Sequence, residues 1–264
     1  MSLIVNWLLE KDIFPDTEEE LVHAIEKNGG RYKFCRSLEN LILNSPVIFY
    51  GSLGLAAELH RKTKATPGVF CNTKKFFCSQ WYKTVPKNLL LQDKILFTNV
   101  SDFCRDPGLC LQTAGIVGTD IFVRPDSPLK PFSGRVINAY KVKPQDLDFG
   151  FYYDDLKLPI VVSERKTVES EWRFVIKGDQ VITGSGYRKN RKKDCQIYPG
   201  SAPWKFACSI AKQLTPPDPL YIMDICESSG SLKLLELNPF SGADLYSCDR
   251  NLIVQAVHCT ILDA

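Results

Sequence analysis

The sequence lacks the marks of several protein classes, and each absence narrows the expectation. No uninterrupted apolar run approaches the roughly 20 residues that a membrane-spanning helix needs. The first residues lack the basic start and the small-residue cleavage site of a secretory signal. The net charge is only +3, far from the basic excess of a protein that coats nucleic acid or an anionic membrane. We therefore expect a cytoplasmic protein without a membrane partner, and nucleic acid is not an expected partner.

Local metal-binding and disulfide patterns are missing as well. The ten cysteines include no Cys-x-x-Cys pair, and His23, His60 and His258 lie too far apart to give zinc-ligand spacing. A chain of 264 residues with 44% hydrophobic content can bury a core without cross-links, so we expect reduced thiols. A catalytic Cys–His pair that meets only in space stays open, because no local pattern tests it.

The N-terminal part predicts a small lobe with helices on either side of a strand. Residues 16–30 predict a helix, with Thr17 and Glu20 as a capping box at its start and Asn-Gly at its end. Residues 45–52 predict a short buried strand that runs into a glycine turn, and residues 53–62 predict a second helix.

From residue 115 onward the apolar runs are short and bounded by turn residues, which is typical of strands. A helix is expected over residues 202–214, and a final helix follows the cap residue Asp249. The expected strands cover residues 115–124, 136–140, 158–163, 171–176, 181–185, 220–226 and 232–238.

Polar residues gather on the last predicted hairpin. Glu236 and Asn238 are two residues apart, so they project from the same face of one strand. If residue 230 is at the centre of the turn, Asp224 lies directly opposite Glu236. Two opposed carboxylates in otherwise apolar strands repel each other, and Mg²⁺ with oxygen ligands is a usual compensation. An exposed polar face on an edge hairpin is the alternative, and spacing does not decide between them.

Glu171 and Arg173 form a second polar pair. They share one face of the strand at 171–176, opposite the face that carries Trp172 and Phe174. The pair is either a solvated strand face or one wall of a cleft.

Four motifs occur in an order that resembles the ATP-grasp fold, in the clade with two arginines and one lysine at the nucleotide site. They are Val123-Arg-Pro125, Lys130-Pro-Phe-Ser-Gly134, Glu171-Trp-Arg-Phe174, and Asp224 followed by residues 234–239. The resemblance covers roughly residues 115–250. It implies an α+β protein whose two lobes, at 96–162 and 163–264, clasp ATP behind a small α/β lobe at 1–95.

The resemblance also implies roles for individual residues. Mg²⁺ would be held by Asp224, Glu236 and Asn238. Nucleotide binding would fall to Arg124, Lys130, Val162, Ser163, Glu164, Glu171 and Arg173. The three residues from Val162 to Glu164 would lie against the adenine, while Arg124 could instead form a surface ion pair. Catalysis would involve Lys130, Arg173 and Arg188. Arg188 begins the basic run at 188–193, which either contacts an anionic substrate or is simply solvated.

The expected function is that of an ATP-dependent carboxylate–amine ligase acting through an acyl phosphate. Its partners would be ATP, a small-molecule or peptide carboxylate, and an amine acceptor. A phosphotransferase on the same nucleotide site is the first alternative. A nucleotide-binding or nucleic-acid-binding module without turnover is the second.

Overall fold

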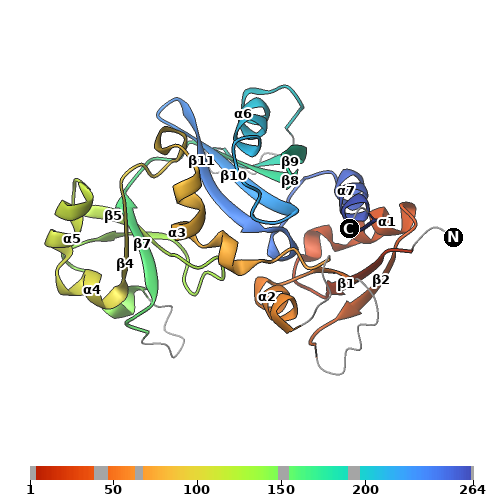
Figure 1. The fold of residues 1–264 in the computed structure, drawn as a ribbon, viewed down its shortest axis with the longest axis horizontal. Helices are drawn as coiled ribbons and strands as arrows, with labels where there is room; N and C mark the ends of the chain where they lie inside the picture. Colours follow the sequence, from red (N-terminus) through yellow and green to blue (C-terminus); the bar gives the residue numbers. More distant parts are fainter. Residues whose placement is uncertain (1–3, 39–46, 63–67, 148–154, 190–196, 263–264) are drawn as a thin grey trace.

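The computed structural model describes residues 4–38, 47–62, 68–147, 155–189 and 197–262, except for the side chains of Asp16, Arg188 and Lys189. Figure 1 shows three sheets with helices packed around them. The strands are β1 (Asn6–Glu10), β2 (Arg31–Cys35), β3 (Val47–Tyr50), β4 (Ile95–Asn99), β5 (Asp120–Pro125), β6 (Arg135–Asn138), β7 (Pro159–Glu164), β8 (Ser170–Lys177), β9 (Gln180–Lys189), β10 (Leu220–Ser228) and β11 (Ser231–Pro239). The helices are α1 (Pro15–Lys27), α2 (Leu53–Lys62), α3 (Cys78–Trp81), α4 (Val100–Arg105), α5 (Pro107–Ala114), α6 (Ala202–Ala211) and α7 (Arg250–Leu262). Short 3₁₀ helices are η1 (Thr73–Phe76), η2 (Tyr82–Thr84), η3 (Lys87–Leu89), η4 (Pro144–Leu147) and η5 (Phe240–Gly242).

The N-terminal sheet is parallel, in the order β2-β1-β3. Helix α1 confirms the predicted helix, but the predicted capping box is wrong. The helix begins at Pro15, which needs no partner for a backbone N–H, and Thr17 Oγ1 donates to the carbonyl of Phe14 (3.3 Å) rather than capping the helix. Strands β1 and β2 were not predicted.

The middle sheet is antiparallel, in the order β4-β7-β5-β6, with α4 and α5 beside it in Figure 1. The strand predicted over 115–124 is wrong in its first half. Gly115 has a left-handed backbone (φ 63) and closes α5, so the strand begins only at Asp120. The strand predicted over 136–140 lies at Arg135–Asn138.

The third sheet is antiparallel, in the order β11-β10-β8-β9, and both predicted hairpins are present. Asp224 does lie opposite Glu236. The premise behind that prediction was wrong, however. Ser228 pairs with Ser231, so the turn is centred half a residue earlier, and a bulge that leaves Leu235 without a partner restores the register.

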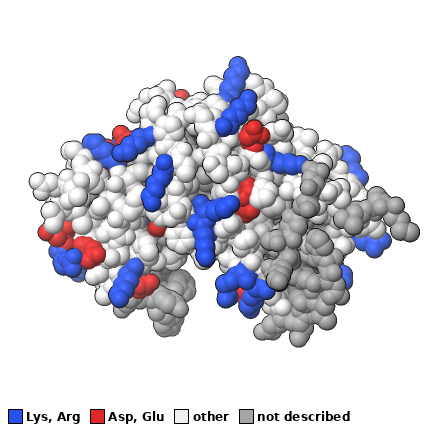
Figure 2. Space-filling model, viewed as in Figure 1, with Lys and Arg blue, Asp and Glu red and all other residues white. Residues whose placement is uncertain are grey.

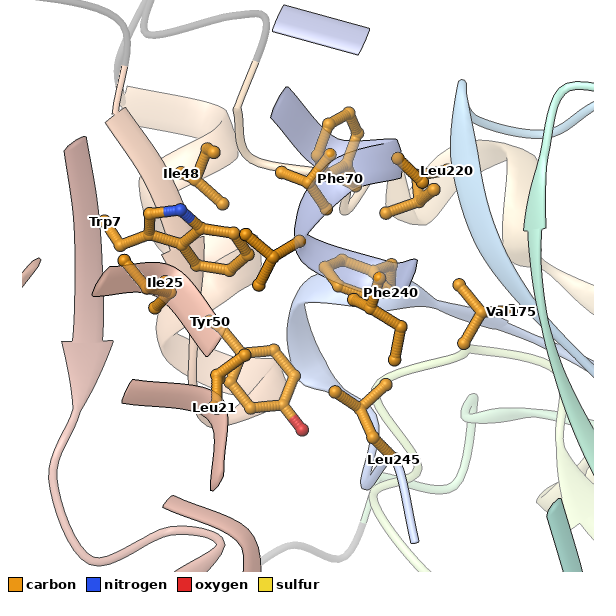
Figure 3. Close-up of a cluster of buried hydrophobic side chains, with 14 of the residues drawn as sticks. Trp7, Leu21, Ile25, Ile48, Tyr50, Phe70, Val175, Leu220, Phe240 and Leu245 are labelled. Atoms are coloured by element: carbon orange, nitrogen blue, oxygen red, sulfur yellow. The ribbon is translucent and has the colours of Figure 1, made fainter. Parts of the chain in front are cut away.

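Both faces of the third sheet are covered. On one face, α7 and the N-terminal lobe form a shared core in which Trp7, Tyr50 and Phe70 pack with Val175 and Phe240 (Figure 3). The other face packs against α6 and against residues 73–91, so that segment belongs with the third sheet rather than the N-terminal one.

Two further expectations concern the helices near the C-terminus. Helix α6 ends at Ala211, three residues earlier than predicted. Asp249 caps α7 as predicted, because its Oδ1 accepts from the backbone N–H of Leu252 (3.0 Å). Within the described ranges, no helix combines the length and apolar character needed to cross a bilayer.

Candidate active site

A cavity of about 390 Å³ lies between the middle sheet and the third sheet. Its walls contain basic, acidic, aromatic and aliphatic side chains, but no cysteine or histidine among the described residues. The lining residues are Tyr82, Leu91, Gln92, Phe122, Arg124, Pro125, Lys130, Phe132, Ser133, Gly134, Val136, Lys166, Val168, Glu171, Arg173, Tyr187, Asp224, Leu235, Glu236 and Tyr246.

Asp224 and Arg173 form a two-point ion pair from neighbouring strands β10 and β8. Arg173 Nε donates to Asp224 Oδ1 (2.8 Å), and Nη2 donates to Oδ2 (2.7 Å). The remaining Nη1 donates to the carbonyl of Asp244 (2.7 Å), so the guanidinium is fixed on three sides. Burial raises the pKa of Asp224, and Arg173 offsets that rise only in part. The pair therefore places a positive charge and a carboxylate at fixed points in a buried site.

Glu236 receives cations from the opposite wall. Arg124 on β5 donates to Glu236 Oε1, and Lys130 Nζ lies 3.0 Å from Oε2. Burial alone would raise the pKa of Glu236, but Arg124 and then Lys130 outweigh it and hold the pKa well below its usual range. Lys130 has a left-handed backbone (φ 49), which directs its loop toward the cavity at the cost of some strain. The two sheets therefore meet through opposite charges.

Asn238 lies between the two carboxylates. Its Nδ2 donates to Asp224 Oδ2 and to Glu236 Oε2, at 3.0 Å each. Two carboxylates and an amide are hard oxygen donors of the kind that Mg²⁺ prefers, and Mg²⁺ commonly uses one or two carboxylates together with substrate phosphates. No cluster of three or more His, Cys, Asp or Glu side chains that could hold a metal occurs in the described part of the chain. The donor set therefore fits a magnesium ion shared with phosphate oxygens, once the Asn238 amide turns its oxygen inward.

An aromatic pair supports Arg173 from the side. The rings of Tyr187 and Tyr246 are stacked with centroids 4.8 Å apart and an angle of 10°. The Cζ atom of Arg173 lies 4.8 Å from the Tyr246 ring centroid and 5.4 Å from that of Tyr187, in cation–π contact. Tyr187 also donates to Glu171 Oε2 (2.6 Å). Glu171 and Arg173 thus lie in the cavity wall, and the solvated strand face considered from the sequence is wrong.

The structure does not bring every predicted residue to the cavity. Val162 and Ser163 are buried in the interior of the middle sheet, where β7 pairs with both β4 and β5. Glu164 forms ion pairs with Lys94 (2.9 Å) and Lys166 (3.0 Å). None of the residues from Val162 to Glu164 is a lining residue, so their predicted contact with adenine has no geometric support.

Arg188 can be placed only by its backbone, which pairs opposite Glu171 in β9. Its side chain, and the predicted role of the basic run, lie outside the described residues. On the face shown in Figure 2, basic side chains are spread out rather than gathered in one patch.

Several lining residues were missed by sequence reasoning. Lys166 and Val168 line the cavity just after β7, while Arg165 turns away to pair with Asp120 (3.5 Å). Gln92 and Tyr246 carry no local motif, so no sequence signal could have identified them. The nine cysteines in the described part of the chain all have free thiols, as expected.

Two facing sheets with a charged cavity between them define the class of this protein, since this is the ATP-grasp fold. The sequence profile of an ATP-grasp domain, the second family of its clade, matches residues 112–256, which is more than half of the chain. The chain belongs to this ATP-grasp family.

Solved structures with the same fold are distant in sequence. The ATP-grasp ligase PsnB, complexed with a minimal precursor, is 16% identical with a TM-score of 0.60, covering 97% of this chain and 99% of that one. The RimK domain ATP-grasp protein of Sphaerobacter thermophilus is 11% identical with a TM-score of 0.63, covering 96% and 99%. The D-cycloserine synthetase DcsG is 13% identical with a TM-score of 0.62, covering 97% and 99%. None of the curated proteins compared with the sequence matches it.

Proposed function

We propose that this protein is an ATP-dependent ligase that joins a carboxylate to an amine through an acyl phosphate. One observation carries the proposal. Arg124 and Lys130 from the middle sheet meet Glu236 from the third sheet, beside the Asp224–Arg173 pair. Cations and carboxylates converging from two lobes on one cavity match the needs of a triphosphate and its divalent cation.

The basic residues would divide the phosphates between them. Arg124 offers a planar fork at the end of β5, and Lys130 offers a mobile point charge from its loop. Arg173 is fixed by Asp224, Asp244 and the tyrosine pair, so its charge needs no reorganisation when negative charge develops on the transferred phosphoryl group. Glu171 would keep Tyr187 in place against Arg173.

Mg²⁺ would be held by Asp224, Glu236 and Asn238 together with phosphate oxygens. When bound, it would supply charge neutralisation between the phosphate groups. The protein must then release Arg124 and Lys130 from Glu236, so that the two cations become available to the nucleotide.

The chemistry needs no side-chain nucleophile. An oxygen of the substrate carboxylate attacks the γ-phosphorus, the bond to the β–γ bridging oxygen breaks, and ADP leaves. The amine then attacks the acyl carbon, the bond from carbon to the phosphate oxygen breaks, phosphate leaves, and the amine loses a proton. The described cavity walls, which hold neither Cys nor His, are consistent with a site that works by positioning and charge.

The carboxylate would come from a peptide or a small molecule, and the acceptor would be an amine. Two similar folds suggest this range, since PsnB is complexed with a precursor peptide and DcsG is a D-cycloserine synthetase. At identities of 16% and 13%, they indicate a class of candidates and do not identify one.

The test is a screen of amino acids, peptides and other carboxylates, each with an amine, for stimulated release of ADP and phosphate. Mass spectrometry of the products should show condensation with loss of water. A stable phosphorylated product would instead indicate a phosphotransferase. Arg124→Met should abolish the stimulated release, whereas Arg36→Met, at an exposed arginine on the N-terminal lobe, should not change it.

A further inference from the structure

Gln92 is buried in the wall of the cavity with half of its amide unused. Its exposed fraction is 6%, and its Oε1 has no hydrogen-bond partner within the described residues. A buried amide oxygen without a partner costs stability, and such groups are uncommon in folded proteins. Gln92 lines the same cavity as the proposed phosphate site, but none of the charged residues discussed above accounts for it.

The backbone around Gln92 is held firmly at the junction of the two sheets. The N–H of Leu91 donates to the carbonyl of Leu234 on β11 (3.0 Å). On the other side, Asp93 forms an ion pair with Lys166 (3.1 Å), which also lines the cavity. Gln92 is therefore fixed between β11 and the segment that leaves β7, and its oxygen is positioned before any ligand binds.

The cavity surface near the middle sheet is apolar and flat. Phe122 and Val136 are directly opposite each other on β5 and β6, so they project to the same face of the sheet. Gly134 lies so close to Phe122 that an added Cβ would be 2.5 Å from ring atom Cζ, which means that a side chain there would displace the ring. From the other wall come Leu91, Val168 and Leu235. Such a slot suits a planar aromatic ring.

The apolar slot and the charged cluster lie at different places along β8. Val168 comes before the strand begins at Ser170, and Arg173 lies inside it. At about 3.3 Å per residue, roughly 10 Å of strand separates Ser170 from Arg173. One nucleotide can therefore place its phosphates at the charged cluster and its base in the slot beside Gln92.

We infer that Gln92 reads the nucleobase, its Oε1 accepting a hydrogen bond from the exocyclic amino group at position 6 of adenine. This inference rests on the proposed function, because it requires ATP in the cavity. An unused acceptor that is already fixed loses little freedom on binding, and it gains its first partner. A base without that amino group would leave Oε1 buried and unpaired.

The test compares ATP with purine riboside triphosphate, which differs by having hydrogen in place of the amino group. Calorimetry in excess Mg²⁺ should show that the wild-type protein binds ATP about tenfold more tightly. Gln92→Met keeps the length of the side chain but removes the acceptor, so the preference for ATP should disappear or reverse. Gln80→Met, the same change at an exposed glutamine on α3, should keep the wild-type preference.

The outcomes separate the two ideas. If the wild-type protein binds no Mg·ATP, the proposed function fails. If it binds Mg·ATP and Gln92→Met keeps the full preference for ATP, the role of Gln92 fails while the proposed function stands. The ligand-free variant also has its own readout. Removal of an unpaired buried oxygen should leave the midpoint of thermal unfolding unchanged or raised, and a lowered midpoint would mean that Gln92 has a structural partner instead.

Discussion

Arg124 on β5 donates a hydrogen bond to Glu236 on β11, so one ion pair joins the middle sheet to the third sheet across 112 residues of sequence. Lys130 contacts the other oxygen of the same carboxylate. In the proposed function, the two cations serve phosphates and Glu236 serves Mg²⁺. All three must therefore change partners when Mg·ATP binds. Nucleotide and metal should bind cooperatively, because each replaces a partner that the other removes.

Glu236→Gln should uncouple the two binding events. The variant frees Arg124 and Lys130 from their internal partner, so Mg²⁺-free ATP should bind it at least as well as it binds the wild-type protein. Mg²⁺ should strengthen ATP binding about tenfold or more in the wild-type protein and have little effect in the variant. Calorimetric titration of ATP in excess EDTA and in excess Mg²⁺ measures both quantities.

A matched control is Glu19→Gln, which neutralises an exposed carboxylate on α1, far from the cavity in sequence and outside its lining. It should keep the wild-type effect of Mg²⁺ on ATP affinity. A Glu236→Gln protein that retained the full effect would contradict the assignment of Glu236 to the metal.

Asp224→Asn should destabilise the protein even without nucleotide. The side chains of Arg173 and Asp224 are only 10% and 2% exposed, and removal of the carboxylate charge leaves a buried guanidinium without compensation. Loss of one partner of a buried ion pair costs about 3 kcal/mol or more of unfolding free energy. Chemical denaturation at neutral pH measures the change. Asp12→Asn breaks the exposed Arg36–Asp12 pair and should have no measurable effect, so equal losses in the two variants would refute the argument.

The opposition of Asp224 and Glu236 shows how far local sequence patterns reach. Period-two alternation placed Glu236 and Asn238 on one face, and the structure confirms that both contact Asp224 or each other. The register itself depended on the bulge at Leu235, which turn counting did not include. A one-residue error there would have turned Glu236 away from Asp224.

Contacts between distant segments were beyond those patterns. The sequence motifs named Arg124 and Lys130, but not that both contact Glu236, because no local rule relates residues more than 100 positions apart. Likewise, β1 and β2 were missed because parallel strands need a crossover helix and have no hairpin turn between them. Gln92 and Tyr246 reach the cavity only through tertiary packing.

Asp218 should make stability depend on pH in an unusual direction. Burial raises its pKa to about 6, although its carboxylate accepts a hydrogen bond from the Asn72 N–H (3.0 Å). Because the folded pKa lies above the unfolded value, the neutral acid is favoured in the folded state. The contribution to stability is fully present below the unfolded pKa and is lost as the pH rises through about 6.

Asp218→Asn should therefore gain stability relative to the wild-type protein as the pH rises from about 4 to about 7, by roughly 3 kcal/mol at most. Denaturant unfolding at several pH values measures the difference. Asparagine can still accept from the Asn72 N–H, so the hydrogen bond is not the variable. Asp179→Asn, at an exposed position in the β8–β9 turn, should show no such trend. A difference that stayed constant with pH would exclude a raised pKa at Asp218.

The position of Arg124 depends on a contact two residues later in the chain. Asp126 is buried, and its carboxylate accepts from the backbone N–H and from the hydroxyl of Ser79 on α3, at 2.7 Å each. The N–H of Cys78 also donates to the carbonyl of Asp126 (3.0 Å). Because α3 packs on the third sheet, these bonds fix the end of β5 relative to the opposite wall of the cavity.

Ser79→Ala should consequently weaken Mg·ATP binding by a few-fold and Asp126→Ala by about tenfold, since the first removes one hydrogen bond and the second removes both that reach the carboxylate. Neither residue lines the cavity, so a loss of affinity can arise only through the placement of Arg124. Combining Asp126→Ala with Arg124→Met decides the matter. If Asp126 acts through Arg124, the double variant should bind no more weakly than Arg124→Met alone, whereas additive losses would mean that Asp126 acts elsewhere. Ser209→Ala, which removes a similar hydroxyl-to-carbonyl bond (2.8 Å) on exposed α6, should leave the affinity unchanged.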